Sequence, residues 1–101
     1  MTKSKFIVQI VLHDTDSREA YDTLNEAMTA KGFAPELPGK KVSYHLPLGG
    51  YWCEGDMTPG DVRVMAAEAA DATGYDYGIV VVRANGWSVM RLKRVEPAPQ
   101  E

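Results

Sequence analysis

The strongest constraint on the fold is an apolar run near the N-terminus, residues 6–12, with the sequence FIVQIVL. Successive side chains of a strand point to opposite faces of its sheet, and both faces of this run carry apolar residues. One face would present Phe6, Val8, Ile10 and Leu12, and the other Ile7, Gln9 and Val11. Such a run is typical of a strand flanked and covered by other elements, so it predicts a central strand.

Two amphipathic helices are predicted after this strand. Asp16 with Glu19 forms a capping-box pattern for the first helix, and Gly32 provides its left-handed stop. Thr58 and Pro59 begin the second helix, with Asp61 near the positive end of its dipole, and Gly74 ends it. The apolar stripes are Ala20, Tyr21, Leu24, Ala27 and Met28 in the first helix, and Val62, Met65, Ala66, Ala69 and Ala70 in the second.

Four further strands are expected. Residues 33–39 hold two prolines and a glycine and predict a loop, whereas residues 40–46 alternate as a half-buried strand. Residues 51–54 predict a return strand at a sheet edge, forming a hairpin with 40–46. Residues 77–83 and 87–95 predict a second hairpin, joined by an Asn-Gly turn at positions 85 and 86.

The predicted order is β-α-β-β-α-β with an extra C-terminal β-strand. It corresponds to an α+β fold, a ferredoxin-like α/β sandwich with a mostly antiparallel sheet and two helices on one face. The length of 101 residues fits one domain, which we place at residues 1–96, followed by a flexible tail at 97–101. The second sheet face would remain for solvent, a partner or a ligand.

Composition restricts the classes of function. No apolar run approaches the roughly 18 residues that span a membrane, and no signal-peptide pattern is present, so a cytoplasmic protein is expected. The single cysteine, Cys53, fits a reducing compartment and a small buried residue, and excludes a multi-cysteine zinc site. No phosphate-binding loop, dinucleotide motif or zinc helix occurs, and neither a cofactor nor a metal is predicted.

Three residues are candidates for catalysis. His13 and Asp14 follow the first strand, where side chains can project into a cleft, and His45 lies on a predicted strand. Histidine can transfer a proton near neutral pH, and a carboxylate can orient water or hold a cation. The alternative is structural: Asp14 caps a turn, and each histidine is a surface residue.

A basic strip near the C-terminus contains Arg83, Arg91, Lys93 and Arg94. It is the candidate RNA-binding surface, although the net charge of −3 opposes sequence-independent binding of nucleic acid. The alternative for these four residues is the solvated face of a hairpin. Aromatic residues could stack on unpaired bases, but most of them also fit a core or a dimer contact.

The stretch IVLHDTDSREAYDTLNEAMTAKGF resembles the start of the Cas2 nucleases, whose first strand ends in an acidic residue. Over nearly its full length the chain resembles the GhoS-type endoribonuclease antitoxins of type V toxin-antitoxin systems. The residues that carry this likeness are KFIVQIVLHD, YDTLNEAMTAKGF, KVSYHLPLGGYWCEGDMT, TPGDVRVMAAEAADATG and the closing IVVV and RANGWSV. The resemblance implies a ferredoxin-like fold and cleavage of the messenger RNA of a partner toxin.

Two hypotheses follow from the sequence. The first is a small RNA-binding protein, with endoribonuclease activity as an open question, in which His13 or His45 is the acid or base and Arg83 or Arg91 stabilises charge. Its partner would be single-stranded RNA or messenger RNA. The second is a non-catalytic module that forms a homodimer through its open sheet face or an edge strand, with no membrane partner.

Overall fold

The first strand lies in the middle of a three-stranded sheet. The computed structural model describes residues 3–15, 17–38, 42–84 and 92, and in it β1 (Ser4–Leu12) is flanked by β4 (Gly50–Gly55) and β5 (Tyr77–Arg83). Both neighbours are antiparallel to β1, and Val8 lies opposite Tyr51 on one side and Val81 on the other. The prediction of a central strand is confirmed.

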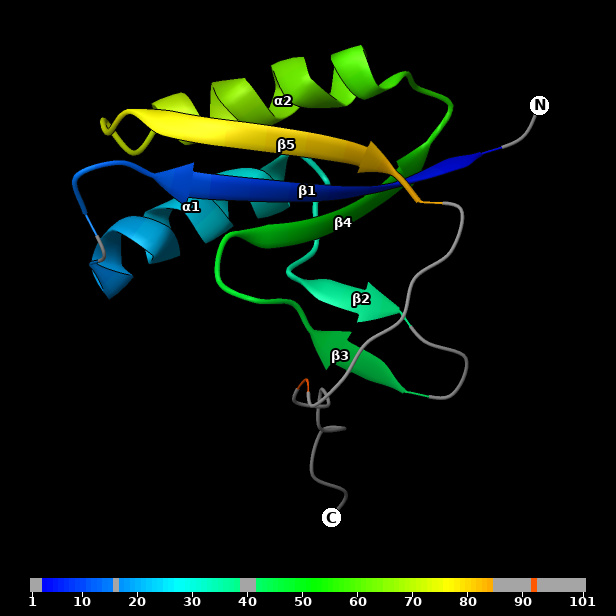
Figure 1. Cartoon of the computed structure of the whole chain (residues 1–101), viewed down its shortest axis with the longest axis horizontal. Coiled ribbons are helices and arrows are strands. Elements are labelled where there is room, and N and C mark those ends of the chain that lie inside the picture. Colours follow the sequence, from blue (N-terminus) through cyan, green and yellow to red (C-terminus); the bar gives the residue numbers. More distant parts are fainter. Residues whose placement is uncertain (1–2, 16, 39–41, 85–91, 93–101) are drawn as a thin grey trace.

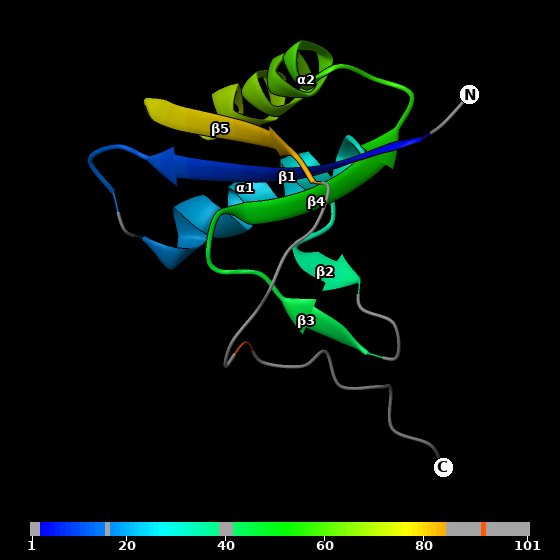
Figure 2. The same cartoon turned by 45° about the vertical axis from the view of Figure 1, so that its right-hand side comes forward.

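Two helices cover one face of this sheet, as Figures 1 and 2 show. They are α1 (Arg18–Ala30) and α2 (Pro59–Asp71). The apolar side chains that β1 directs to this helix face are all buried, together with one stripe from each helix. From β1, α1 and α2 these core residues are Phe6, Val8, Ile10, Leu12, Ala20, Tyr21, Leu24, Met28, Val62, Ala66, Ala69 and Ala70. The α+β class with two helices over an antiparallel sheet is therefore confirmed.

The starts of the two helices differ in how well the sequence predicted them. Thr58 and Asp61 form the expected capping box, in which the Asp61 N–H donates to Thr58 Oγ1 at 3.1 Å and the Thr58 N–H to Asp61 Oδ2 at 3.0 Å. The first helix instead uses Ser17 as its N-cap, so the prediction of Asp16 was wrong by one residue. The Ser17 hydroxyl accepts from the Ala20 N–H, whereas Asp16 lies outside the described residues.

The middle of the chain departs from the predicted hairpin. β2 (Glu36–Pro38) lies inside the segment predicted as a loop and pairs with β3 (Ser43–His45) in a separate two-stranded sheet. β4 pairs with β1, so the expected pairing of residues 40–46 with 51–54 was wrong. An isolated bridge between Ala34 and Trp52 joins the segment before β2 to β4.

We call the sheet surface opposite the helices the open face. β1 and β5 contribute to it Ile7, Gln9, Val11, Gly78, Val80 and Val82, because these residues alternate with those in the core. Trp52 is on the same side of β4 but is buried, as is Leu37 in β2, and both lie outside the main core cluster. The open face is therefore covered at β4 and exposed at β1 and β5.

The predicted strand 87–95, the Asn-Gly turn before it and the tail 97–101 lie outside the described residues, with Leu92 as the exception. Leu92 is half-buried and belongs to no helix or strand.

Gly49 and Gly32 provide a matched test of the turn before β4. Both have positive φ, +82° and +93°, but a Cβ at Gly49 would clash with the Ile10 carbonyl oxygen, whereas one at Gly32 would meet nothing within 4 Å. We expect Gly32→Ala to cost about 1–2 kcal/mol from the backbone conformation alone, and Gly49→Ala to cost clearly more. Urea unfolding measures both, and equal losses would contradict the close approach of Gly49 to β1.

Candidate functional site

His13 lies at the end of β1, beside the start of β5. Its backbone N–H donates to the Asp76 carbonyl oxygen at 2.7 Å, which fixes the main chain, while its side chain is exposed. The imidazole Nε2 lies 3.5 Å from the position that a Cβ on Gly78 would take. The ring therefore lies over Gly78, at the edge of the open face, where solvent and a ligand can reach it.

Asp14 makes the turn between β1 and α1. Its φ of +62° is in the left-handed region, which aspartate tolerates better than most residues, and its side chain is exposed. The next residue, Thr15, accepts a hydrogen bond from the Ser17 N–H through its hydroxyl at 3.0 Å. The left-handed φ of Asp14 fits the alternative interpretation of this residue, a structural role in the turn.

His45 lies in the other sheet. It is exposed in β3 and stands opposite Glu36 of β2, whereas His13 belongs to the main sheet. Within the part of the chain that the structure describes, no hydrogen bond or ion pair connects the side chains of His13, Asp14 and His45. The structure does not bring the three predicted catalytic residues together.

Arg83 lies at the opposite end of β5 from His13. It pairs with Phe6, and its guanidinium carbon lies 5.8 Å from the centroid of the Phe6 ring, on the helix side of the sheet. Asp76, beside His13, directly precedes β5 and is seven residues before Arg83. At about 3.3 Å per residue this is a separation of about 23 Å. His13 and Arg83 of one copy therefore cannot contact the same phosphate.

The other three members of the basic strip, Arg91, Lys93 and Arg94, lie outside the described residues. Among residues 3–15, 17–38, 42–84 and 92, no cluster of three or more His, Cys, Asp or Glu side chains is arranged to hold a metal ion.

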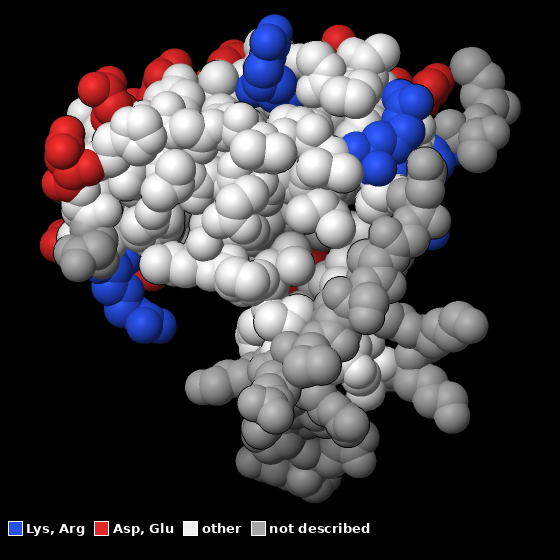
Figure 3. Space-filling model, in the orientation of Figure 1, with Lys and Arg blue, Asp and Glu red and all other residues white. Residues whose placement is uncertain are grey.

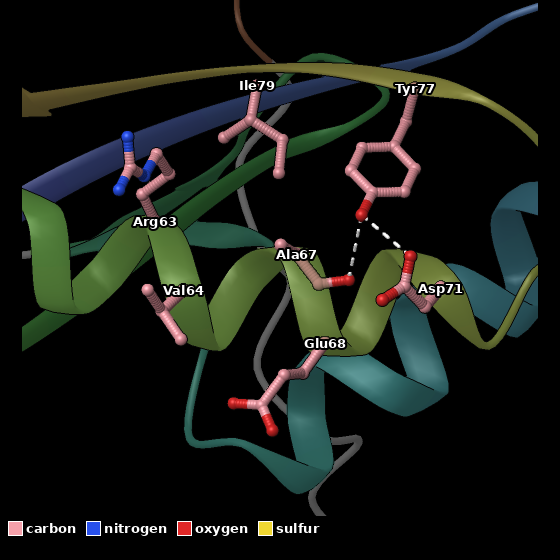
Figure 4. Close-up of a pocket in the computed structure, with 7 residues that line it drawn as sticks. All are labelled: Arg63, Val64, Ala67, Glu68, Asp71, Tyr77 and Ile79. Carbon is pink, nitrogen blue, oxygen red and sulfur yellow. Dashed lines mark hydrogen bonds between the residues drawn. The ribbon is translucent and has the colours of Figure 1, made fainter.

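The sequence did not reveal a groove between α2 and β5. It has a volume of about 410 Å³ and is lined by Arg63, Val64, Ala67, Glu68, Asp71, Tyr77 and Ile79 (Figure 4). At one end the Tyr77 hydroxyl lies 2.7 Å from Asp71 Oδ1 and 3.3 Å from the Ala67 carbonyl oxygen. The hydrogen bond to Asp71 raises the pKa of Tyr77 above its ordinary value. No local sequence motif predicts this groove, because the groove depends on how α2 packs against β5.

The open face is apolar and largely uncharged where it is exposed. Val11, Val80 and Val82 are 51%, 60% and 51% exposed, and Figure 3 shows uncharged residues over the centre of this surface with charged ones toward its margins. Tyr51 and Trp52, two aromatic candidates for base stacking, are buried.

None of the described helices is long and apolar enough to cross a membrane.

Cys53 is buried in β4, as the sequence predicted. Burial, with a smaller contribution from the neighbouring Glu54, raises the pKa of its thiol to about 11. Next to it in the core, burial raises the pKa of Tyr51 to about 12, and the Tyr51 hydroxyl donates to Asn25 Oδ1. Cys53 is thus a packed thiol and not an activated nucleophile.

Comparison with known protein families, with curated proteins and with solved structures finds no match to this chain.

The raised pKa of Cys53 has a consequence for alkaline stability. Unfolding returns the thiol toward its ordinary pKa of 9.0, so the stabilisation from burying it neutral is complete below pH 9 and is lost as the pH rises toward 11. We expect the urea midpoint of Cys53→Ala to fall less between pH 8 and pH 10.5 than that of the unmodified chain. Parallel curves for the two proteins would show that the thiol is not held neutral by burial.

Proposed function

We propose that the chain is a non-catalytic, homodimeric interaction module. One observation carries the proposal: His13, His45 and Arg83 lie at separate places, while apolar side chains are exposed on the sheet and on α2. A general base and a charge-stabilising cation must both reach the reacting group, and this arrangement within one copy opposes that. Exposed valines on a rigid layer are suited to a protein contact.

The proposal includes a ferredoxin-like arrangement of the fold. In that arrangement the first strand lies between the strands that precede and follow the second helix, as β1 lies between β4 and β5. The remaining strand would lie outside β4, where the bridge between Ala34 and Trp52 supports it. The C-terminal strand that the sequence predicts at residues 87–95 lies outside the described residues and is not included in this proposal, because a hairpin with residues 77–83 would occupy the outer edge of β5.

Homodimerisation is tested by sedimentation equilibrium of the full chain over a range of micromolar concentrations. We expect a mass of twice the 11.1 kDa of one chain, because association removes exposed apolar surface from water. A mass of one chain at every concentration would overturn the proposal. The same samples incubated with labelled single-stranded RNA should show no cleavage.

A second candidate is RNA binding by a GhoS-like antitoxin, with RNA cleavage as its further step. It is supported by the exposed guanidinium of Arg83, by the basic residues that follow in the sequence, and by the exposed ring of His13. In this candidate the basic residues hold the RNA backbone, and His13 transfers a proton to or from a ribose hydroxyl or a leaving oxygen.

The RNA hypothesis predicts that Arg83→Ala weakens binding of labelled single-stranded RNA at low salt, with affinity falling further as salt is added. If the RNA is cleaved, His13→Ala should reduce cleavage at least 100-fold. Asp14→Ala and His45→Ala should leave cleavage nearly unchanged, because Asp14 shapes a turn and His45 belongs to the other sheet. Measuring cleavage with and without a chelator tests the need for a metal. No binding by the unmodified protein would remove this candidate.

A further inference from the structure

The outer edge of β5 presents backbone groups that β1 does not use. The Ala84 N–H donates to the Lys5 carbonyl oxygen at 2.8 Å, and the His13 N–H to that of Asp76 at 2.7 Å. Because bonding alternates along an antiparallel pair, residues 76, 78, 80, 82 and 84 direct their N–H and C=O groups toward β1. Residues 77, 79, 81 and 83 direct theirs outward, where no described strand pairs with them. This is a sheet edge that can accept another strand.

The groove beside this edge is apolar in its middle and oppositely charged at its two ends. Val64, which is 52% exposed, lies with Ala67 and Ile79 in the middle. Arg63 lies toward one end and Asp71 toward the other, with Glu68 on the outer rim (Figure 4). A second hollow of about 220 Å³, lined by Gly60 and Val81, continues the groove beyond Arg63.

The register between α2 and β5 locates the centre of this surface. Tyr77 reaches Asp71 and Ala67, and Val81 lines the same hollow as Gly60, so α2 and β5 run in opposite directions. Ile79, midway between Tyr77 and Val81, shares its groove with Val64 and Ala67. A two-fold axis at Ile79 of β5 would therefore also pass beside the middle of α2.

Resting on the homodimer proposed above, we propose that β5 pairs antiparallel with β5 of a second copy, and that α2 packs against the partner's α2. Residues 63 and 68 are centred on the same point of α2 as residues 64 and 67. A two-fold axis beside that point therefore brings Arg63 to the partner's Glu68 and Val64 to the partner's Ala67. The two sheets then form one continuous sheet, and the exposed side chain of Val64 is covered.

Charge complementarity favours a second copy over another occupant of the groove. The same surface carries a cation at one end and anions at the other, so an antiparallel copy places opposite charges together at both ends, and a parallel copy would place like charges together. Glu68 already lies 3.7 Å from Lys31 of its own chain, and both side chains are exposed. The partner's Arg63 would thus join an exposed ion pair, which fixes orientation more than affinity.

A charge exchange tests the interface. Arg63→Glu alone and Glu68→Arg alone each place like charges opposite one another, and each should raise the dimer dissociation constant at least tenfold by sedimentation equilibrium. The double variant restores opposite charges and should return the dissociation constant to within about threefold of the unmodified chain. Val64→Glu should give a monomer, since it places a carboxylate in the apolar middle. Urea unfolding of each variant confirms that the fold is kept.

Val11→Lys is the matched control, because Val11 is exposed on the open face but lies in β1, which is separated from the proposed interface by β5. It should leave the dimer mass unchanged. Dissociation by Val11→Lys, with no effect from the exchanges at Arg63 and Glu68, would place the interface on the open face. That outcome overturns this inference while the homodimer stands. An unmodified chain that is monomeric, with its edge covered by its own residues 85–101 or by nothing, would overturn both.

Discussion

The structure depends on burying one row of side chains from β1. Phe6, Val8, Ile10 and Leu12 are all at most 3% exposed, and they share one core cluster with residues of α1, α2, β4 and β5. Burial of each such side chain stabilises the fold by about 1.5–3 kcal/mol, more than the roughly 1 kcal/mol that a helix cap contributes. Because this row needs a continuous cover, both helices lie on the same side of the sheet, and β4 and β5 take the two edges of β1.

This arrangement also fixes what remains at the surface. With both helices on one side, the open face keeps its valines exposed, and α2 keeps Val64 exposed on its outer side. The length of the strands separates their ends, so groups that follow β1, such as His13, lie far from groups at the end of β5, such as Arg83. The packing that stabilises the monomer therefore separates His13 from Arg83 within one copy and leaves apolar side chains exposed.

The sequence predicted the features that local chemistry determines. Apolar residues on both faces of the run 6–12 predicted the central strand, and Thr58, Pro59 and Asp61 predicted the start of α2, because neighbouring residues determine both. It failed where distant partners decide. Because of Pro35 and Pro38, the segment that contains β2 was predicted as a loop. A proline lowers strand propensity, but it is tolerated in a three-residue strand that another segment pairs with. β4 was predicted to pair with residues 40–46, the strand before it in the sequence. It pairs instead with β1, and this pairing buries Tyr51 and Cys53.

The same limit applies to the candidate site, and it links the two functional hypotheses. Sequence proximity grouped His13 with Asp14 by their neighbouring positions, but only the register of β5 shows that Arg83 is at the far end. Antiparallel pairing of two β5 strands about Ile79 would bring the Arg83 end of one copy to the His13 end of the other. Arg83 would then lie just beyond the partner's Tyr77. Two strand spacings, about 10 Å, would separate it from the partner's β1, which directly precedes the partner's His13. Arg83 lies on the helix side of the sheet and His13 lies on the open face. For both to act on one phosphate, the RNA would have to pass around the edge of the sheet. An RNA-cleaving site that used both His13 and Arg83 would therefore require assembly, whereas the proposed assembly would require only the groove and the edge of β5.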